Sequence, residues 1–297
     1  MCIRDRVRAG ISSGLKVKGV RRGYAGLLEE DIIDMDTMSV TDIVQRGGTI
    51  LFTSRCKEMM TPEGQQKAAD ICRKHGIDGM VVIGGDGSFR GAQKLSANGI
   101  NTIGIPGTID LDIACTEYTI GFDTACNTAM EAIDKVRDTS ASHERCSIIE
   151  VMGRTAGHIA LWCGISNGSE YVLIPERAEE NDEEEIIKKI MSKRRIGKKH
   201  HIIVNAEGVG HSHEMAKRIE AATGIETRAT VIGHIQRGGN PSCRDRVYAS
   251  AMGARAVDLL LKGQTNRVVA YKNGEFTDFD IDLSLIHISE PTRLRCI

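Results

Sequence analysis

The sequence predicts an α/β protein with parallel sheets, divided into two domains. Short apolar runs of strand length recur along the chain, and segments with the spacing of amphipathic helices separate them. Glycine supplies 32 of the 297 residues, against the ~7% usual in proteins, which is typical of many tight turns between strands and helices. At ~150 residues per domain, this length favours two domains, each large enough to bury its own core.

The predicted elements alternate along the chain, as parallel sheets require. The helix expected over 122–139 shows the pattern, because Ala125, Ala129 and Ile133 fall on one of its faces. The other expected helices are 61–75, 182–193, 212–223 and 244–262. The expected strands are 15–20, 80–83, 102–105, 147–151, 171–174, 201–204, 227–232 and 268–271.

Composition argues against several classes of protein. The 39 basic and 40 acidic residues leave a formal charge of −1, so no overall positive field attracts nucleic acid or anionic lipid. No apolar run approaches the ~20 residues of a membrane span, and no signal peptide opens the chain, so we expect a cytoplasmic location. The nine cysteines form no CxxC pair, which favours reduced thiols over disulfides or a zinc site.

Both ends of the chain read as translated sequencing-adapter DNA. One adapter string can encode residues 1–5, and its reverse complement can encode 283–288. We therefore expect residues 1–6 and 283–297 to be non-native and leave them out of the fold prediction.

The first chemical motif follows the strand expected at 80–83. Residues 84–88 (GGDGS) form a glycine-rich turn before a segment expected to be helical. Such a turn lets backbone N–H groups approach phosphate oxygens, and Asp86 could hold a magnesium ion there. A merely tight turn is an equal alternative. The motif is neither a P-loop nor a GxGxxG fingerprint, which disfavours P-loop NTPases and dehydrogenases.

The second motif, residues 106–112 (PGTIDLD), follows the next expected strand. Asp110 and Asp112 lie two residues apart, and in an extended segment their side chains would point the same way. Paired carboxylates at the C-terminal end of a strand suit a general base and an orienting or metal-linked partner. Solvated acids in a turn are the alternative, but two such loops at successive strand ends favour a function.

Arginines recur at strand ends and in glycine-rich turns. A guanidinium group can bind two phosphate oxygens at once, although any single surface arginine is usually only a solvated charge. Together they indicate a site for more than one phosphate. They are Arg55, Arg145, Arg154, Arg228 and Arg237, the last within residues 233–239 (GHIQRGG).

The motifs GGDGS, PGTID, MGR (152–154) and GHIQRGG, in this order, resemble those of the bacterial-type ATP-dependent 6-phosphofructokinase family. The resemblance spans residues 7–282. It implies the phosphofructokinase fold, with two Rossmann-like three-layer domains and mainly parallel sheets. Residues 7–121 and 237–282 would form an ATP-binding domain, and residues 122–236 a fructose 6-phosphate and effector domain, with the sugar in the cleft between them.

The same resemblance implies a function and assigns roles. The chain would be a Mg²⁺-dependent, allosterically regulated glycolytic kinase that phosphorylates fructose 6-phosphate with ATP as a homotetramer. Asp110 would deprotonate the sugar 1-hydroxyl, helped by Thr108 and Asp112, and Arg55 and Arg154 would neutralise the transferring phosphoryl group. The nucleotide would be bound by Tyr24, Arg55, Cys56, Gly85, Asp86, Gly87 and Ser88, with Asp86 on the metal. The sugar phosphate would be bound by Thr108, Ile109, Asp110, Arg145, Met152, Gly153, Arg154, Glu207, Arg228, His234, Ile235, Gln236 and Arg237, with Arg145 and Arg228 serving a neighbouring subunit.

An effector site for ADP or phosphoenolpyruvate between subunits is also implied. Thr37 and Ile196 stand where some members have an effector-binding arginine and a lysine, which leaves the effector's identity open. The matching residues are Arg8, Arg137, Gly168, Ser169, Glu170, Lys198, Lys199 and His200.

Three features depart from the family pattern. Leu111 replaces the usual asparagine between the paired acids, so an amide that could tune the base is absent. The opening strand and GGDxPGxN loop expected before Val7 are missing, and so is a segment expected after Asp282. We therefore expect the chain as written to bind ATP poorly or to fold poorly, which robust phosphorylation of fructose 6-phosphate by it would refute.

Two other functions compete with an ATP-dependent kinase. Members that use diphosphate typically carry aspartate in place of Gly87 and lysine in place of Gly107, so glycine at both positions favours ATP. A non-catalytic sugar-phosphate or nucleotide sensor is the second competitor. Such a remnant would be expected to have lost at least one of four residues that remain here: Asp86, Asp110, Asp112 and Arg154.

Overall fold

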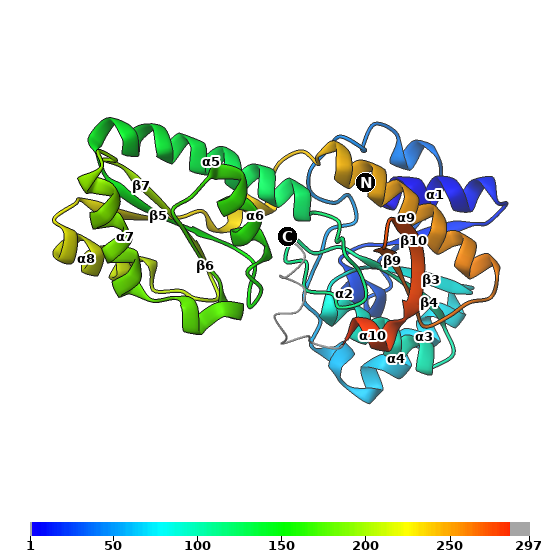
Figure 1. The fold of residues 1–297 in the computed structure, drawn as a ribbon. Coiled ribbons are helices and arrows are strands. Elements are labelled where there is room, and N and C mark those ends of the chain that lie inside the picture. The colour runs from blue at the N-terminus through cyan, green and yellow to red at the C-terminus, as the bar shows by residue number, and fades with distance from the viewer. Residues whose placement is uncertain (1, 286–297) are drawn as a thin grey trace. The chain divides into compact units, whose positions relative to one another are not determined.

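The computed structural model describes residues 2–285 and divides them into two units. Unit 1 comprises residues 2–108, 112–121 and 240–285, and unit 2 comprises residues 109–111 and 122–239. Apart from residues 109–111, the chain enters unit 2 at α5 (Phe122–His143; Figure 1) and leaves it after Gly239. These bounds differ from the sequence expectation in two places, since 109–111 and 237–239 belong to unit 2.

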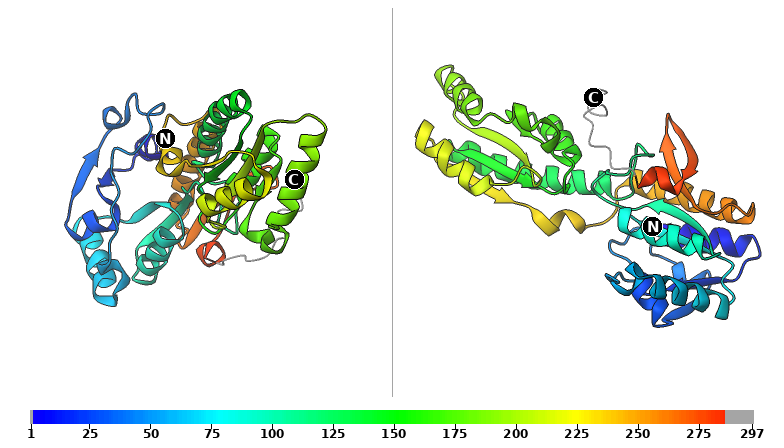
Figure 2. Two further views of the ribbon diagram at one scale, coloured as in Figure 1. Left: turned by 90° about the vertical axis from the view of Figure 1, so that its left-hand side faces the viewer. Right: turned by 90° about the horizontal axis from the view of Figure 1, so that it is seen from below.

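Unit 1 is built on a four-stranded sheet in the order β10-β9-β4-β3. The strands β3 (Gly79–Gly84), β4 (Asn101–Pro106) and β9 (Arg267–Lys272) are parallel, because α4 (Asp86–Ala97) and α9 (Cys243–Leu261) carry the chain back between them. The edge strand β10 (Glu275–Asp280) is antiparallel to β9 and forms with it the hairpin drawn orange to red in Figure 2.

Two parts of unit 1 correct the sequence expectations. The segment 15–20 is not a buried strand of the main sheet, because β1 (Val17–Val20) pairs antiparallel with β2 (Ile32–Met35) in a separate two-stranded sheet. Residues 2–6, left out of the fold prediction, begin the helix α1 (Cys2–Ser12), which packs on α9. The adapter origin of both ends stays a prediction, and residues 286–297 lie outside the described residues.

The remaining helices of unit 1 pack on one another, on α4 and on the β9–β10 hairpin. A buried carboxylate, Asp245, fixes the last residues before the chain enters unit 2, because its Oδ1 accepts hydrogen bonds from the Tyr118 hydroxyl and the Gly121 N–H, each at 2.7 Å. The helices are α2 (Gly23–Leu28), α3 (Pro62–Lys74) and α10 (Ile281–Ser284), with short 3₁₀ turns at Met38–Val40 and Glu58–Met60.

Unit 2 is a three-layer α/β unit. Its sheet is entirely parallel, in the order β6-β7-β5-β8. One apolar cluster joins the sheet to α5 and α6, and another joins it to α7 and α8, so helices cover both faces (Figure 1). The elements are β5 (Cys146–Val151), α6 (His158–Asn167), β6 (Tyr171–Leu173), α7 (Glu183–Arg195), β7 (His201–Ala206), α8 (Ser212–Thr223) and β8 (Thr227–Val231).

The architecture confirms the predicted α/β class with mainly parallel sheets. All five expected helices are present, and so are all eight expected strands, although the first of them lies in the small antiparallel sheet. No helix in the described part of the chain combines the length and the apolar character that crossing a membrane requires.

Candidate functional site

The glycine-rich residues 84–88 lead directly from β3 into α4. Gly85 is the N-cap of this helix and Asp86 is its first residue. Free N–H groups at a helix N-terminus attract anions, so the loop is suited to phosphate. A Cβ atom at Gly87 would meet nothing within 4 Å, which leaves open space over this turn.

Gly107, the second glycine used to distinguish the donors, has a packing role. A Cβ atom there would lie 2.7 Å from Cγ2 of Ile83, which is closer than carbon atoms approach in folded proteins. The structure therefore explains this glycine without a ligand, whereas the space at Gly87 remains available to one.

Tyr24 supports the same loop. Its hydroxyl donates a hydrogen bond of 2.7 Å to the carbonyl oxygen of Ser88, and burial raises the pKa of this phenol. Gly91 accommodates the ring, since a Cβ atom there would lie 2.4 Å from Cε2 of Tyr24. Of the other predicted nucleotide residues, Arg55 is exposed and Cys56 is partly buried, both just before the 3₁₀ turn at Glu58–Met60.

Asp110 is the most buried of the predicted catalytic side chains. It is 4% exposed, and its Oδ2 lies 3.3 Å from Nε of Arg154. Unit 2 therefore brings the predicted base and a predicted phosphoryl-neutralising cation together. Thr108 and Asp112, the predicted helpers, belong to unit 1 and are partly buried.

The backbone at Leu111 overturns one step of the sequence argument. Leu111 has a φ of 55°, in the left-handed region, so the segment between Asp110 and Asp112 is not extended. The alternation rule for strands does not apply there, and the inference that both carboxylates point the same way for that reason is wrong.

Side-chain oxygens of two residues accept hydrogen bonds from the backbone of the MGR segment, residues 152–154. Oε1 of Glu207 accepts the backbone N–H groups of Gly153, at 3.1 Å, and of Arg154. Oε1 of Gln236 accepts the N–H of Met152 at 2.7 Å, and Gln236 is 1% exposed. Both side chains were predicted as sugar ligands. In the structure they fix the loop that carries Arg154.

Arg145 and Arg228, the pair predicted to serve a neighbouring subunit, meet at one acid. Nε of Arg145 lies 2.7 Å from Oε2 of Glu226, and Nε of Arg228 lies 2.8 Å from Oε1. These hydrogen bonds lower the pKa of the Glu226 carboxyl. Sequence analysis missed Glu226, which lies one residue before β8, because its contact with Arg145 joins residues 81 positions apart.

The GHIQRGG segment forms a short 3₁₀ turn, Gly233–Arg237, after β8. His234, Ile235 and Arg237 are exposed, and among them Ile235 is a large apolar side chain open to solvent. These predicted sugar-phosphate ligands are accessible, unlike the buried Gln236.

Predicted effector residues also gather in unit 2. The buried carboxylate of Glu170 pairs with the ammonium of Lys198 and accepts the N–H of Ile202 at 2.6 Å. Burial and the nearby charge of Arg137 lower the pKa of Lys198. Burial, and then the charges of Lys198 and Arg137, lower the pKa of His200. An anion would relieve this accumulation of positive charge.

The other predicted effector residues are less closely joined. Arg137 donates to the carbonyl oxygen of Asn167, next to Gly168 and Ser169 at the end of α6. Lys199 forms an exposed ion pair with Glu144, and Arg8 is an exposed residue of α1 in unit 1.

His201, the first residue of β7, gives a testable pH dependence. It is fully buried, and neither ring nitrogen has a hydrogen-bond partner among the described residues. Burial, followed by the charges of Lys198 and neighbouring cations, lowers its pKa from 6.5 to about 4. Between these values the unfolded chain binds a proton that the folded chain does not, so stability falls as the pH falls.

We therefore expect acid to destabilise the protein in this window. His201 alone should lower the free energy of unfolding by about 2 kcal/mol from about pH 7 to about pH 5. Urea unfolding at both pH values measures this, and His201→Leu should flatten the dependence. His213→Leu, on the exposed surface of α8, is the control. Equal pH dependence in His201→Leu and the unaltered protein would contradict the prediction.

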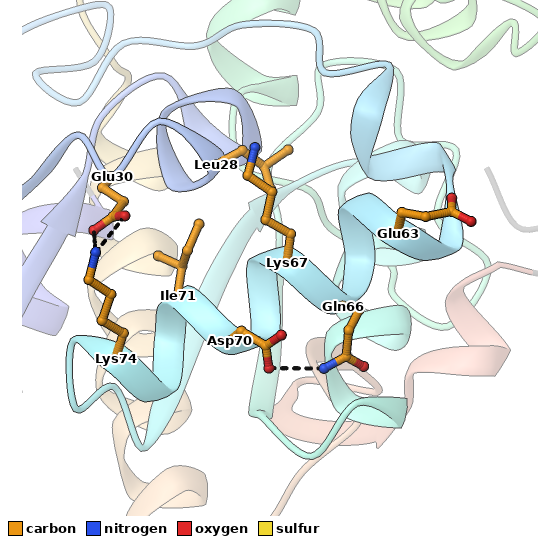
Figure 3. A pocket seen from close by; sticks show the side chains of 8 residues that line it. All are labelled: Leu28, Glu30, Glu63, Gln66, Lys67, Asp70, Ile71 and Lys74. Atoms are coloured by element: carbon orange, nitrogen blue, oxygen red, sulfur yellow. Dashed lines mark hydrogen bonds and ion pairs between the residues drawn. The ribbon is translucent and has the colours of Figure 1, made fainter.

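A hollow of about 780 Å³ on unit 1 lies along α3 and contains none of the predicted site residues. Figure 3 shows two interactions among its side chains: the Lys74 ammonium lies 2.7 Å from both Glu30 oxygens, and Gln66 donates to Asp70 at 2.9 Å. Four of its polar side chains are thus paired with one another, and none of the phosphate-binding loops reaches it, so the hollow is not a candidate for the site.

The fold and these loops define the class of protein. Parallel sheets with glycine-, acid- and arginine-bearing loops at strand ends are typical of doubly wound α/β proteins, which bind ligands at that edge. The family model described as Phosphofructokinase matches residues 1–260. The chain belongs to the phosphofructokinase family.

Similar proteins support this membership. An ATP-dependent 6-phosphofructokinase of Clostridium botulinum (strain Loch Maree / Type A3) is 57% identical over 283 residues, which cover 95% of this chain and 88% of that protein. A protein of the same name from Clostridium acetobutylicum is 56% identical over the same shares. The solved phosphofructokinase from Saccharomyces cerevisiae is 31% identical with a TM-score of 0.88, over 96% of this chain and 43% of that one.

Proposed function

We propose that this chain is an ATP-dependent 6-phosphofructokinase. It transfers the γ-phosphoryl group of ATP to the 1-hydroxyl of fructose 6-phosphate and yields ADP and fructose 1,6-bisphosphate, a step of glycolysis. The observation that carries this conclusion is the 57% identity, over 95% of the chain, to a relative of that name. The pairing of Asp110 with Arg154 supplies the chemistry that the reaction needs.

In the proposed mechanism Asp110 is the general base. Its carboxylate takes the proton of the 1-hydroxyl, the sugar oxygen attacks the γ-phosphorus, and ADP leaves with the electrons of the broken P–O bond. Arg154, beside Asp110, stabilises negative charge on the transferring group. The Glu207 carboxylate keeps Arg154 in place because it accepts hydrogen bonds from the backbone N–H groups of residues 153 and 154.

The nucleotide phosphates are proposed to bind over residues 84–88, at the N-terminus of α4. Asp86 fits a magnesium ion that arrives with ATP, because Mg²⁺ is usually held by one or two carboxylates and by substrate phosphates. Within the described residues, no three His, Cys, Asp or Glu side chains gather as a metal cage. When bound, the ion would neutralise phosphate charge, and Asp86 would exchange its present partner Arg90 for it.

Arg145, Arg228, His234 and Arg237 are proposed to bind the 6-phosphate of the sugar. Because Glu226 already pairs Arg145 with Arg228, the two guanidinium groups are held together for one phosphate. We propose that this pair completes the site of a neighbouring subunit in a homotetramer located in the cytoplasm. The cluster around Glu170 and Lys198 is the proposed effector site.

The choice of donor is tested at Gly87. The full-length gene product, assayed with fructose 6-phosphate, should turn over ATP and not inorganic diphosphate. Gly87→Asp places a carboxylate in the open space of the phosphate loop, so kcat/KM for ATP should fall about 10²-fold or more, since apposed like charges cost several kcal/mol.

A matched control adds the same charge elsewhere on the helix. Ala97→Asp lies at the other end of α4 and should leave kcat/KM for ATP unchanged. Turnover of the unaltered protein with diphosphate but not with ATP would overturn the choice of donor.

A further inference from the structure

The three residues 109–111, which include Asp110, belong to unit 2, whereas the residues on either side of them belong to unit 1. Ile109 and Leu111 both pack against the apolar cluster that joins α5 and α6 to the sheet of unit 2. Asp110 lies between two apolar contacts, and its own carboxylate faces Arg154.

The conformation of Leu111 is unusual for its side chain. A φ of 55° suits glycine, and asparagine or aspartate tolerate it because their side chains can form local hydrogen bonds. Leucine has no such compensation, so the surrounding structure must hold it there. The contact of its side chain with the apolar cluster is the interaction that can do so.

The left-handed turn also has a geometric consequence. It redirects the chain immediately after Asp110, so that residue 111 still contacts unit 2 while residue 112 belongs to unit 1. The side chain of Leu111 therefore attaches this segment to the unit that carries Arg154.

We propose that Leu111 is a positioning residue for phosphoryl transfer: packed on the apolar cluster of unit 2, it fixes the Asp110 carboxylate beside Arg154. The inference rests on the proposed function, in which Asp110 is the base. Small displacements of reacting groups affect the rate of the chemical step more than they affect substrate binding.

The test separates the backbone requirement from the apolar contact. In the full-length gene product, Leu111→Gly adopts the left-handed φ without strain but removes the contact. It should lower kcat by about tenfold or more, with little change in KM for either substrate. Leu111→Met keeps an apolar side chain of similar volume and should restore most of the activity.

Leu161→Ala is the matched control, because Leu161 packs against the same cluster from α6. It should lower the thermal midpoint without lowering kcat. Unchanged kcat in Leu111→Gly, or a loss of thermal stability there without loss of kcat, would overturn the inference. An unaltered protein without activity toward ATP and fructose 6-phosphate would instead refute the proposed function, so the two failures are distinguishable.

Discussion

Asp110→Asn is expected to lower kcat by about 10²–10⁴-fold, the range usual for loss of a general base. Asparagine has nearly the same shape and keeps an oxygen that can face Arg154, but it cannot take the proton of the sugar hydroxyl. Substrate binding should change little, since the change removes a step of the chemistry. Steady-state kinetics with ATP and fructose 6-phosphate give kcat and both KM values.

The control for this change is Asp134→Asn, which removes an exposed carboxylate of α5 in the same unit. It should leave kcat unchanged. Near-normal turnover in Asp110→Asn would exclude Asp110 as the base. Because a non-catalytic sensor would show no turnover even before substitution, the unaltered protein also distinguishes the enzyme from that alternative.

The fold was predictable where a local pattern reflects burial. The strands β5 and β7 read as apolar runs because helices cover both faces of their sheet. Other elements lack such a pattern. The helix α6 (HIALWCGISN) carries apolar residues around most of its circumference, so no periodic polar face identified it.

The strand β10 was missed for another reason. Its acid Asp278 would disfavour a strand, but Arg255 and Arg267 neutralise it at 2.8 and 2.7 Å. Those partners come from α9 and β9, and only the tertiary structure brings them together. The turn before it, Asn273-Gly274, has positive φ at both residues, and this hairpin signal was present in the sequence.

The candidate site was likewise predictable only in part from local sequence patterns. The residue types that bind phosphate were recognisable, because glycine turns and arginines appear at strand ends. The groups that hold these turns and arginines in place were not recognisable from the sequence. Glu207 was read as a ligand and Glu226 was not read at all, yet each fixes an arginine-bearing segment. Such supporting contacts join residues about 50 to 80 positions apart, which local sequence patterns do not reveal.

Substitution of Arg154 is expected to lower kcat nearly as much as substitution of Asp110. Arg154→Gln keeps a polar side chain but removes the positive charge that stabilises the transferring phosphoryl group. Loss of one such preorganised group typically costs about 10²–10³-fold in kcat. Arg154→Lys should recover only part of the rate, because an ammonium group cannot reproduce the paired donors of guanidinium. Measured kcat and KM values for the three proteins give the comparison.

The position of Arg154 explains why the loss should appear in kcat. Its side chain is 60% exposed, and its backbone is held at a φ of 54° with the N–H bonded to Glu207, so the charge is directed at Asp110 before any substrate binds. A preorganised charge acts mainly on the transition state, where negative charge spreads over the phosphoryl oxygens. Arg177→Gln, an exposed arginine of the same unit, should leave kcat unchanged. An increase in KM alone in Arg154→Gln would mean that Arg154 only binds substrate, and the mechanism would then need another cation for the phosphoryl group.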